Sequence, residues 1–157
     1  MSKSGTIQAI VAAIFAIGIV IWLHFSVFDK SNVHANADPS ERLENASGGS
    51  SDLLQETIKL INSTCPKDID SETRLDSASY LPGNVFAEYF TLINMEQKSV
   101  DTATIKPAVQ VSILNSIKGN SGYASFRSSN VTFTYIYKDK EQKPLFTIAI
   151  TPEQYNN

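Results

Sequence analysis

The sequence predicts an α+β fold: a small domain of about four antiparallel strands with two helices on one face, preceded by one transmembrane helix. Three observations lead to this prediction. Residues 7–28 form an uncharged and mostly apolar run. Residues 131–138 and 145–151 alternate apolar and polar side chains, as strands buried on one side do. Two further segments repeat apolar residues every three or four positions, which is typical of amphipathic helices. The expected order in the domain is α-β-β-α-β-β.

The apolar run of residues 7–28 is long enough to cross a bilayer. A hydrocarbon core of about 30 Å needs roughly 20 helical residues, and Trp22 lies where an interfacial anchor is expected. Because Lys3 precedes the run, the positive-inside rule makes residues 1–6 a short cytoplasmic tail. The sequence thus predicts a single-pass anchor in the cell inner (cytoplasmic) membrane, with the domain periplasmic or extracytoplasmic and the lipid bilayer as a partner.

A cleaved signal peptide is the alternative to an anchor. Ala35-Asn36-Ala37 fits the small-x-small pattern of a cleavage site, and cleavage after Ala37 would release a secreted domain. The apolar core of a signal peptide spans only about 7–15 residues, however. The longer run here favours an uncleaved signal anchor.

A flexible linker is expected to join the anchor to the domain. Residues 29–50 are mostly polar or small, a composition typical of flexible tethers. The domain then occupies residues 51–157. Its first helix is expected to start at Ser51, to carry apolar residues at helical spacing up to Ile61 and to end before Pro66.

The later elements of the domain follow from turn residues and periodicity. The turn Pro82-Gly83-Asn84 separates two extended runs, and a second helix is expected to end at Gly119. Pro107 fits only near a helix start, so the regular part of this helix should begin around Lys106. The predicted boundaries are 74–81 and 85–94 for the first hairpin, 101–118 for the helix, and 131–138 and 145–151 for the last hairpin.

The last hairpin has one aromatic face and one threonine-rich face. The aromatic face should pack on the helices and the other should be the outer one. Plain solvent exposure explains such a face, and so does docking of a partner. The candidate partner surface consists of Thr132, Thr134, Thr147 and Thr151.

Charge and cysteine content exclude some classes of function. The net charge is −3, and the lysines and arginines are scattered among acids, so no basic face is available for nucleic acid. The single cysteine, Cys65, cannot form an intramolecular disulfide. It is either a buried apolar residue or a free thiol that is reactive or forms an intermolecular disulfide.

Few side chains in the domain are suited to catalysis. Both histidines, His24 and His34, precede the domain, which removes histidine triads, bases and metal ligands. No cofactor motif is present, and we expect no cofactor and no metal site. A hydrolase-like enzyme using the carboxylates of residues Asp68–Asp76 is an alternative, although such clusters are usually surface ion pairs.

The segment Cys-Pro-Lys-Asp-Ile-Asp-Ser-Glu-Thr-Arg-Leu-Asp at residues 65–76 has a structural interpretation. Pro66 would fix the entry of the chain into the sheet, and Asp70 can form a turn through its side chain. Arg74 and Asp76 are two residues apart and therefore share one strand face. We interpret these four residues as a structural latch.

The same segment resembles a block, (C/L)-P-x-x-(V/I)-D-x-x-T-R-L-D, of small uncharacterised bacterial cell-envelope proteins. Residues 130–140 and 146–152 are similar to the closing hairpin of these proteins, and the resemblance covers about residues 52–155. It implies an extracytoplasmic bacterial domain and no activity.

The expected function is therefore a non-enzymatic binding or assembly module, held at the membrane beside a protein partner of the cell envelope. A small-ligand or inhibitor/immunity-type module is the second hypothesis. It would require a cleft lined by residues such as Tyr80, Phe86 or Tyr123. The enzyme built on the acidic segment is the third.

Overall fold

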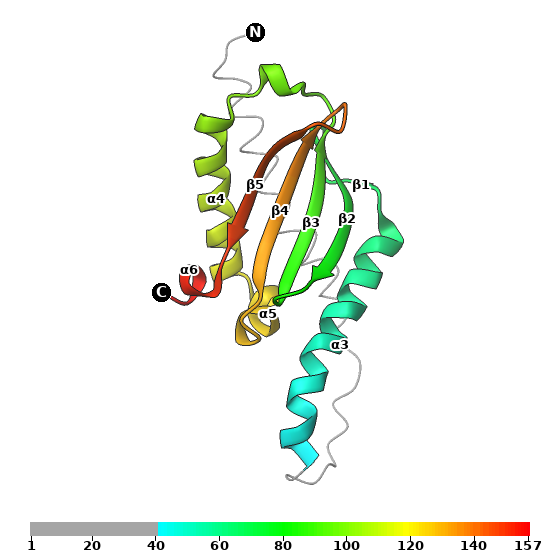
Figure 1. Ribbon diagram of the computed structural model, residues 1–157, viewed down its shortest axis with the longest axis vertical. Coiled ribbons are helices and arrows are strands. Elements are labelled where there is room, and N and C mark those ends of the chain that lie inside the picture. Colours follow the sequence, from blue (N-terminus) through cyan, green and yellow to red (C-terminus); the bar gives the residue numbers. More distant parts are fainter. Residues whose placement is uncertain (1–40) are drawn as a thin grey trace.

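A five-stranded sheet with helices on one side forms the domain in the computed structural model of the protein, which describes residues 41–157 (Figure 1). The strands are β1 (Lys67–Asp68), β2 (Thr73–Leu81), β3 (Val85–Leu92), β4 (Thr132–Asp139) and β5 (Pro144–Ile150). The helices are α3 (Glu41–Thr64), α4 (Thr102–Gly119), α5 (Ala124–Ser128) and α6 (Pro152–Asn156), with the 3₁₀ helices η1 (Gln97–Ser99) and η2 (Ser121–Tyr123). The predicted α+β class is confirmed.

The sheet is mixed, whereas a four-stranded, wholly antiparallel sheet was expected. The strands follow one another in chain order, and only β3 and β4 pair in parallel, with Val85 opposite Thr132. The reason is the connection: α4 carries the chain back along the sheet, so β4 starts beside the start of β3. The fifth strand is β1, whose two residues pair with Arg74 and Leu75.

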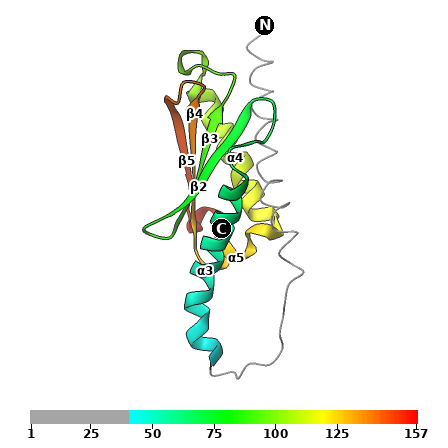
Figure 2. The ribbon, with the colours of Figure 1, turned by 90° about the vertical axis from the view of Figure 1, so that its right-hand side faces the viewer.

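The helices lie on one face of the sheet, as expected (Figure 2). Helix α3 packs against β2 at one side and α4 against β5 at the other. Helix α3 begins earlier than predicted, at Glu41 rather than Ser51. The regular part of α4 begins at Thr102 rather than around Lys106. Asp101 caps this helix, accepting a hydrogen bond from the Thr104 backbone N–H at 3.3 Å.

The core fills the space between the sheet and the helices. Aromatic side chains dominate it: Phe133 of β4 contacts Phe86 of β3, Tyr123 of η2, Phe126 of α5 and Tyr155 of α6. The Tyr155 hydroxyl also donates a hydrogen bond to the Val131 carbonyl at 2.9 Å. Burial of this cluster supplies the main driving force for folding, since each such ring removes a large apolar area from water.

The predicted membrane anchor is not part of the described chain. Within residues 41–157, no helix has both the length and the apolar character required to span a bilayer. The predicted anchor 7–28, the tail 1–6, the cleavage site at Ala37 and residues 29–40 of the linker all lie outside the described residues.

Candidate partner-binding surface

The face of the sheet opposite the helices is the candidate surface. Phe133, Tyr135 and Tyr137 of β4 are buried towards the helices, so the alternating residues between them face outwards. Thr132 and Thr134 are half-buried on this outer face, and Thr147 of β5 is exposed there. The structure thus brings together three of the four threonines of the candidate surface.

The fourth threonine, Thr151, has a different role. It is the N-cap of α6, and its side chain and that of Gln154 form a capping box in which Gln154 Oε1 accepts a hydrogen bond from the Thr151 N–H at 2.8 Å. A Thr-x-x-Gln sequence with proline at the first helical position is a recognisable signal for a helix start. Thr151 ends the sheet rather than belonging to its outer face.

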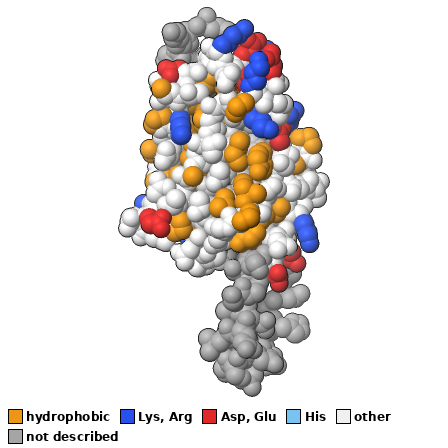
Figure 3. Space-filling model, in the orientation of Figure 1, with side chains coloured by type: hydrophobic (Ala, Val, Ile, Leu, Met, Phe, Trp, Pro, Cys, Tyr) orange, Lys and Arg blue, Asp and Glu red, His pale blue; other side chains and the backbone are white. Residues whose placement is uncertain are grey.

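An apolar stripe runs along the middle of the outer face (Figure 3). The half-buried side chains of Tyr89 and Ile136 are cross-strand neighbours on β3 and β4. Val85 and Leu81 pair across the β2–β3 hairpin, and Leu81 is 37% exposed. The alternation of side chains along each strand identified the threonines but not this stripe. The stripe depends on the register between β3 and β4, which are far apart in the chain.

A chain of polar contacts closes one end of the stripe. Arg74 Nε donates to Asp76 Oδ1 at 2.7 Å, and Thr91 Oγ1 donates to Asp76 Oδ2 at 2.6 Å. Gln142 Nε2 in turn donates to Thr91 Oγ1 at 2.9 Å. Asp76 lies where the register between β2 and β3 shifts. Arg74 and Asp76 therefore contact each other directly.

The other two residues of the predicted latch lie beside β1. Asp70 Oδ1 accepts hydrogen bonds from the backbone N–H groups of Glu72 at 2.7 Å and Thr73 at 2.9 Å, which forms the turn between β1 and β2. Pro66 is exposed, and the Cys65–Pro66 peptide bond is cis. Asp70 and Asp76 thus hold local backbone and side chains, while Asp68 is exposed on β1.

Cys65 is a half-buried free thiol that packs against the core. Burial, together with the nearby carboxyls of Glu88 and Asp76, raises the pKa of the Cys65 thiol. A raised pKa lowers the thiolate fraction and hence the reactivity. Within residues 41–157, no group of three histidine, cysteine, aspartate or glutamate side chains is arranged to hold a metal ion.

Glu88 is a buried acidic residue that the sequence analysis did not identify. It lies on the inner face of β3, opposite Ala78 of β2 and Tyr135 of β4, and is 1% exposed. Its Oε2 atom and the Tyr137 hydroxyl have no hydrogen-bond partner within the described chain. Burial raises the pKa of the Glu88 carboxyl from 4.5 to about 8, so this group is protonated at neutral pH.

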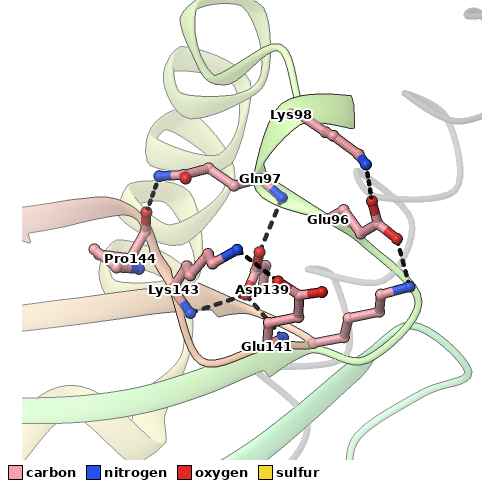
Figure 4. A network of polar contacts seen from close by, with 8 residues as sticks. Glu96, Gln97, Lys98, Asp139, Glu141, Lys143 and Pro144 are labelled. Atoms are coloured by element: carbon pink, nitrogen blue, oxygen red, sulfur yellow. Dashed lines mark hydrogen bonds and ion pairs between the residues drawn. The ribbon is translucent and has the colours of Figure 1, made fainter.

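A second buried carboxylate, Asp139, organises the loops at the end of β4 (Figure 4). It accepts hydrogen bonds from the backbone N–H groups of Gln97 at 2.9 Å and of Glu141 and Lys143 at 2.8 Å each. Desolvation acts to raise the pKa of Asp139, but these donors outweigh it and the pKa is lowered. The carboxylate therefore joins η1 to the β4–β5 turn.

Glu96 adds ion pairs at the same end of the molecule. It contacts Lys140 at 2.7 Å and Lys98 at 2.9 Å (Figure 4). Hydrogen bonds from Lys140 and then Lys98 lower the pKa of Glu96 to about 2. These ion pairs are largely exposed and contribute little to stability. Like the hydrogen bonds of Asp139, the pair between Glu96 and Lys140 connects the η1 segment to the β4–β5 turn.

A comparison with protein families places residues 49–146 in one of them, described as a domain of unknown function, DUF8479. The match covers more than half of the chain. This chain belongs to the DUF8479 family. The matched segment includes most of α3, strands β1 to β4 and helix α4 of the DUF8479 domain. No curated protein matches the sequence.

Two solved structures share the fold of the DUF8479 domain. One is an inferred secreted protein from Pseudomonas aeruginosa, with a TM-score of 0.58 and 16% identity over 68% of this chain and 93% of that chain. The other is the type II secretion system pilotin AspS from Vibrio cholerae, with a TM-score of 0.52 and 12% identity over 71% and 97% of the two chains. At these identities the likeness shows a common fold.

Proposed function

We propose that this protein is a non-enzymatic binding or assembly module of the bacterial cell envelope. Residues 7–28 anchor it in the inner membrane, and the DUF8479 domain binds a protein partner on the extracytoplasmic side. The fold is shared with a protein named as a secretion pilotin and with one inferred to be secreted, which supports an envelope role. An anchor helps such a module because it raises the local concentration beside the partner.

The observation that carries this proposal is the outer face of the sheet. The helices of the described domain lie on the other face (Figures 1 and 2), and the outer face carries the apolar stripe of Leu81, Val85, Tyr89 and Ile136. Contiguous exposed apolar surface on a soluble domain is typical of an interaction site. The threonines beside the stripe can form hydrogen bonds at its rim, as polar residues do at protein interfaces.

The other two hypotheses have weaker structural support. Phe86 and Tyr123 are packed in the core while Tyr80 is exposed at the end of β2, so these residues do not line one ligand cleft. An enzyme using the acidic segment would need its carboxylates near one substrate. Asp70 and Asp76 instead bond to backbone and to neighbouring side chains.

Photo-crosslinking in intact cells tests the proposed surface. A photoreactive phenylalanine analogue at position 89 replaces one aromatic ring by another within the stripe. The matched control carries the same analogue at Val111, which is 59% exposed on α4. We expect a discrete crosslinked envelope protein from position 89 and none from position 111.

Equal adducts from both positions, or no adduct from position 89, would contradict the proposal. Membrane attachment is tested separately by alkaline carbonate extraction of the full chain. The chain should remain with the membrane, and a variant lacking residues 7–28 should be extracted.

A further inference from the structure

The β2–β3 hairpin ends in a tip of exposed apolar residues, which are Tyr80, Leu81 and Pro82. Tyr80 is 36% exposed and Leu81 is 37% exposed. Tyr80 pairs with the buried Phe86 and shares the helix side of the sheet, whereas Leu81 pairs with Val85 on the outer face. The tip thus presents apolar side chains on both sides of the sheet. A partner that covers only the outer face would leave Tyr80 in water.

The tip is held in place by a braced turn. Gly83 and Asn84 have positive φ angles of 85° and 61°, and both residue types tolerate this conformation. Asn84 Oδ1 accepts a hydrogen bond from the Tyr80 hydroxyl at 2.9 Å. Asn84 Nδ2 donates to the carbonyls of Ser129 at 2.7 Å and Asn130 at 3.0 Å. These bonds fix the tip against the connection between α5 and β4.

The two ends of the sheet differ in charge. At the tip end, residues 77–87 and residues 128–137 contain no charged side chain. At the opposite end, η1 and the β4–β5 turn carry the exposed ion pairs around Glu96 and Lys143. Figure 3 shows charged side chains gathered at that upper end and apolar side chains extending towards the tip. Because charged groups are costly to bring into lipid, only the tip end is suited to contact a bilayer.

The neighbouring charges do not favour anionic lipid. The exposed charges on the first part of α3 have both signs, with Asp52, Glu56 and Lys59. The Arg127 guanidinium, which precedes the second uncharged segment, bonds to the carbonyls of Ile117 and Asn120. A contact between the tip and a bilayer therefore depends on apolar side chains and needs no polybasic patch.

The tip lies at the end of the domain that leads to the predicted anchor. Helix α3 starts, at Glu41, towards the same end of the sheet as the hairpin tip (Figures 1 and 2). Residues 29–40 join this helix to the predicted anchor 7–28, and a chain of their length spans up to about 40 Å. The tether thus keeps the tip end of the sheet near the bilayer and is long enough for the tip to touch it.

We infer that the tip of the β2–β3 hairpin, formed by Tyr80, Leu81 and Pro82, inserts into the headgroup region of the bilayer that holds the anchor. Tyrosine suits this region because its ring is apolar and its hydroxyl can stay hydrated. So few apolar residues bind lipid weakly by themselves, but the tether raises their effective concentration at the surface. The inference rests on the membrane attachment in the proposed function. It adds a fixed orientation, in which Tyr89 and Ile136 of the stripe stay free for the protein partner.

Fluorescence quenching of the full chain in phosphatidylcholine vesicles tests this contact. Trp22 is the only tryptophan, so Trp22→Phe combined with Tyr80→Trp places a single tryptophan in the tip. Lipids brominated near the headgroup should quench its emission, and iodide in the water should not. The matched control combines Trp22→Phe with Ser99→Trp, at an exposed residue of η1. Its tryptophan should be quenched by iodide and not by the brominated lipid.

A carboxylate in the tip should abolish the contact, since an ionised side chain is costly to insert. In the chain with Tyr80→Trp, Leu81→Glu should remove the quenching by brominated lipid. The matched control is Leu60→Glu on α3, where the leucine is 38% exposed, and it should leave the quenching unchanged. Circular dichroism checks that both variants keep the fold.

Flotation of the vesicles separates the two possible failures. If the chain floats but the tryptophan at position 80 is quenched by iodide alone, this inference is overturned and the membrane attachment stands. If the chain does not float, the attachment fails and the inference fails with it.

Three further results would also overturn the inference. Equal lipid quenching at positions 80 and 99 would mean that the domain has no preferred end towards the bilayer. A tryptophan at position 80 that neither quencher reaches would mean that a second copy of the chain covers the tip. Lipid quenching that persists in Leu81→Glu would mean that the tip does not insert through its apolar side chains.

Discussion

Glu88 and Asp139 are two buried carboxyl groups in opposite electrostatic situations. Asp139 receives three backbone N–H donors, whereas the described chain offers Glu88 Oε2 none. Each residue lies two positions from a buried aromatic residue of its own strand: Glu88 from Phe86 and Phe90, and Asp139 from Tyr137. Strand alternation could therefore have predicted the face of each carboxyl group. Their partners could not be predicted, because the donors come from other elements.

The raised pKa of Glu88 predicts that its replacement stabilises the protein at high pH. In the unfolded chain the carboxyl loses its proton near pH 4.5, but in the folded chain only near pH 8. The free energy of unfolding should thus fall as the pH rises between these values, by at most about 1.4 kcal/mol per unit of pKa shift. Glu88→Gln should raise the melting temperature at pH 8 and change it little at pH 4.5. The exposed Glu56→Gln is the matched control, and an equal effect of Glu88→Gln at both pH values would contradict the prediction.

At the scale of elements, local sequence signals located most boundaries to within one or two residues. The observed β2 differs from the predicted strand by one residue at its start, and β4 by one residue at each end, because apolar alternation and turn residues act locally. The start of α4 was wrong, since Pro107 is accommodated inside the helix. The parallel pairing of β3 and β4 was also missed, because strand direction depends on where a helix returns the chain.

The two hydrogen bonds between the Asn62 side chain and the Ala78 backbone lead to a prediction of how much α3 stabilises the β2 edge of the sheet. Asn62→Ala removes both hydrogen bonds to Ala78 and leaves a backbone N–H and C=O of β2 without partners. We expect a loss of about 2 kcal/mol in the free energy of unfolding, measured with urea. The uncovered edge should also increase aggregation, followed by light scattering. Asn115→Ala on the exposed side of α4 should do neither, and equal losses from both variants would argue against an edge-capping role.

At the scale of the whole molecule, the candidate surface could be predicted only in part from the sequence. Thr132 and Thr134 share a face because they alternate with buried aromatic residues of β4, which is a local property. The stripe of Tyr89 and Ile136 requires β3 to lie beside β4, and these strands are separated by α4 in the chain. Contacts between strands that are far apart in the chain leave no regular spacing of apolar residues in the sequence. The position of β5 at the edge of the sheet likewise becomes visible only from the order of strands.

The two buried carboxyl groups together predict the pH dependence of stability for the whole domain. The lowered pKa of Asp139 contributes stability that is present above its ordinary value of 3.8 and is lost as the pH falls through the folded value. The raised pKa of Glu88 contributes stability that is lost as the pH rises from 4.5 to about 8. Stability should therefore be greatest between about pH 4 and 5.

Urea unfolding of the full chain from pH 3 to pH 9 measures this profile. Glu88→Gln should flatten the decline above pH 5 and leave the acid side unchanged. Asp139→Asn should lower stability at neutral pH, because an amide cannot replace a carboxylate that accepts three N–H donors, and should make the loss in acid shallower. A wild-type profile that is level between pH 5 and pH 8 would mean that Glu88 gains a partner in solution, since only compensation of its burial would keep the folded and unfolded pKa values equal.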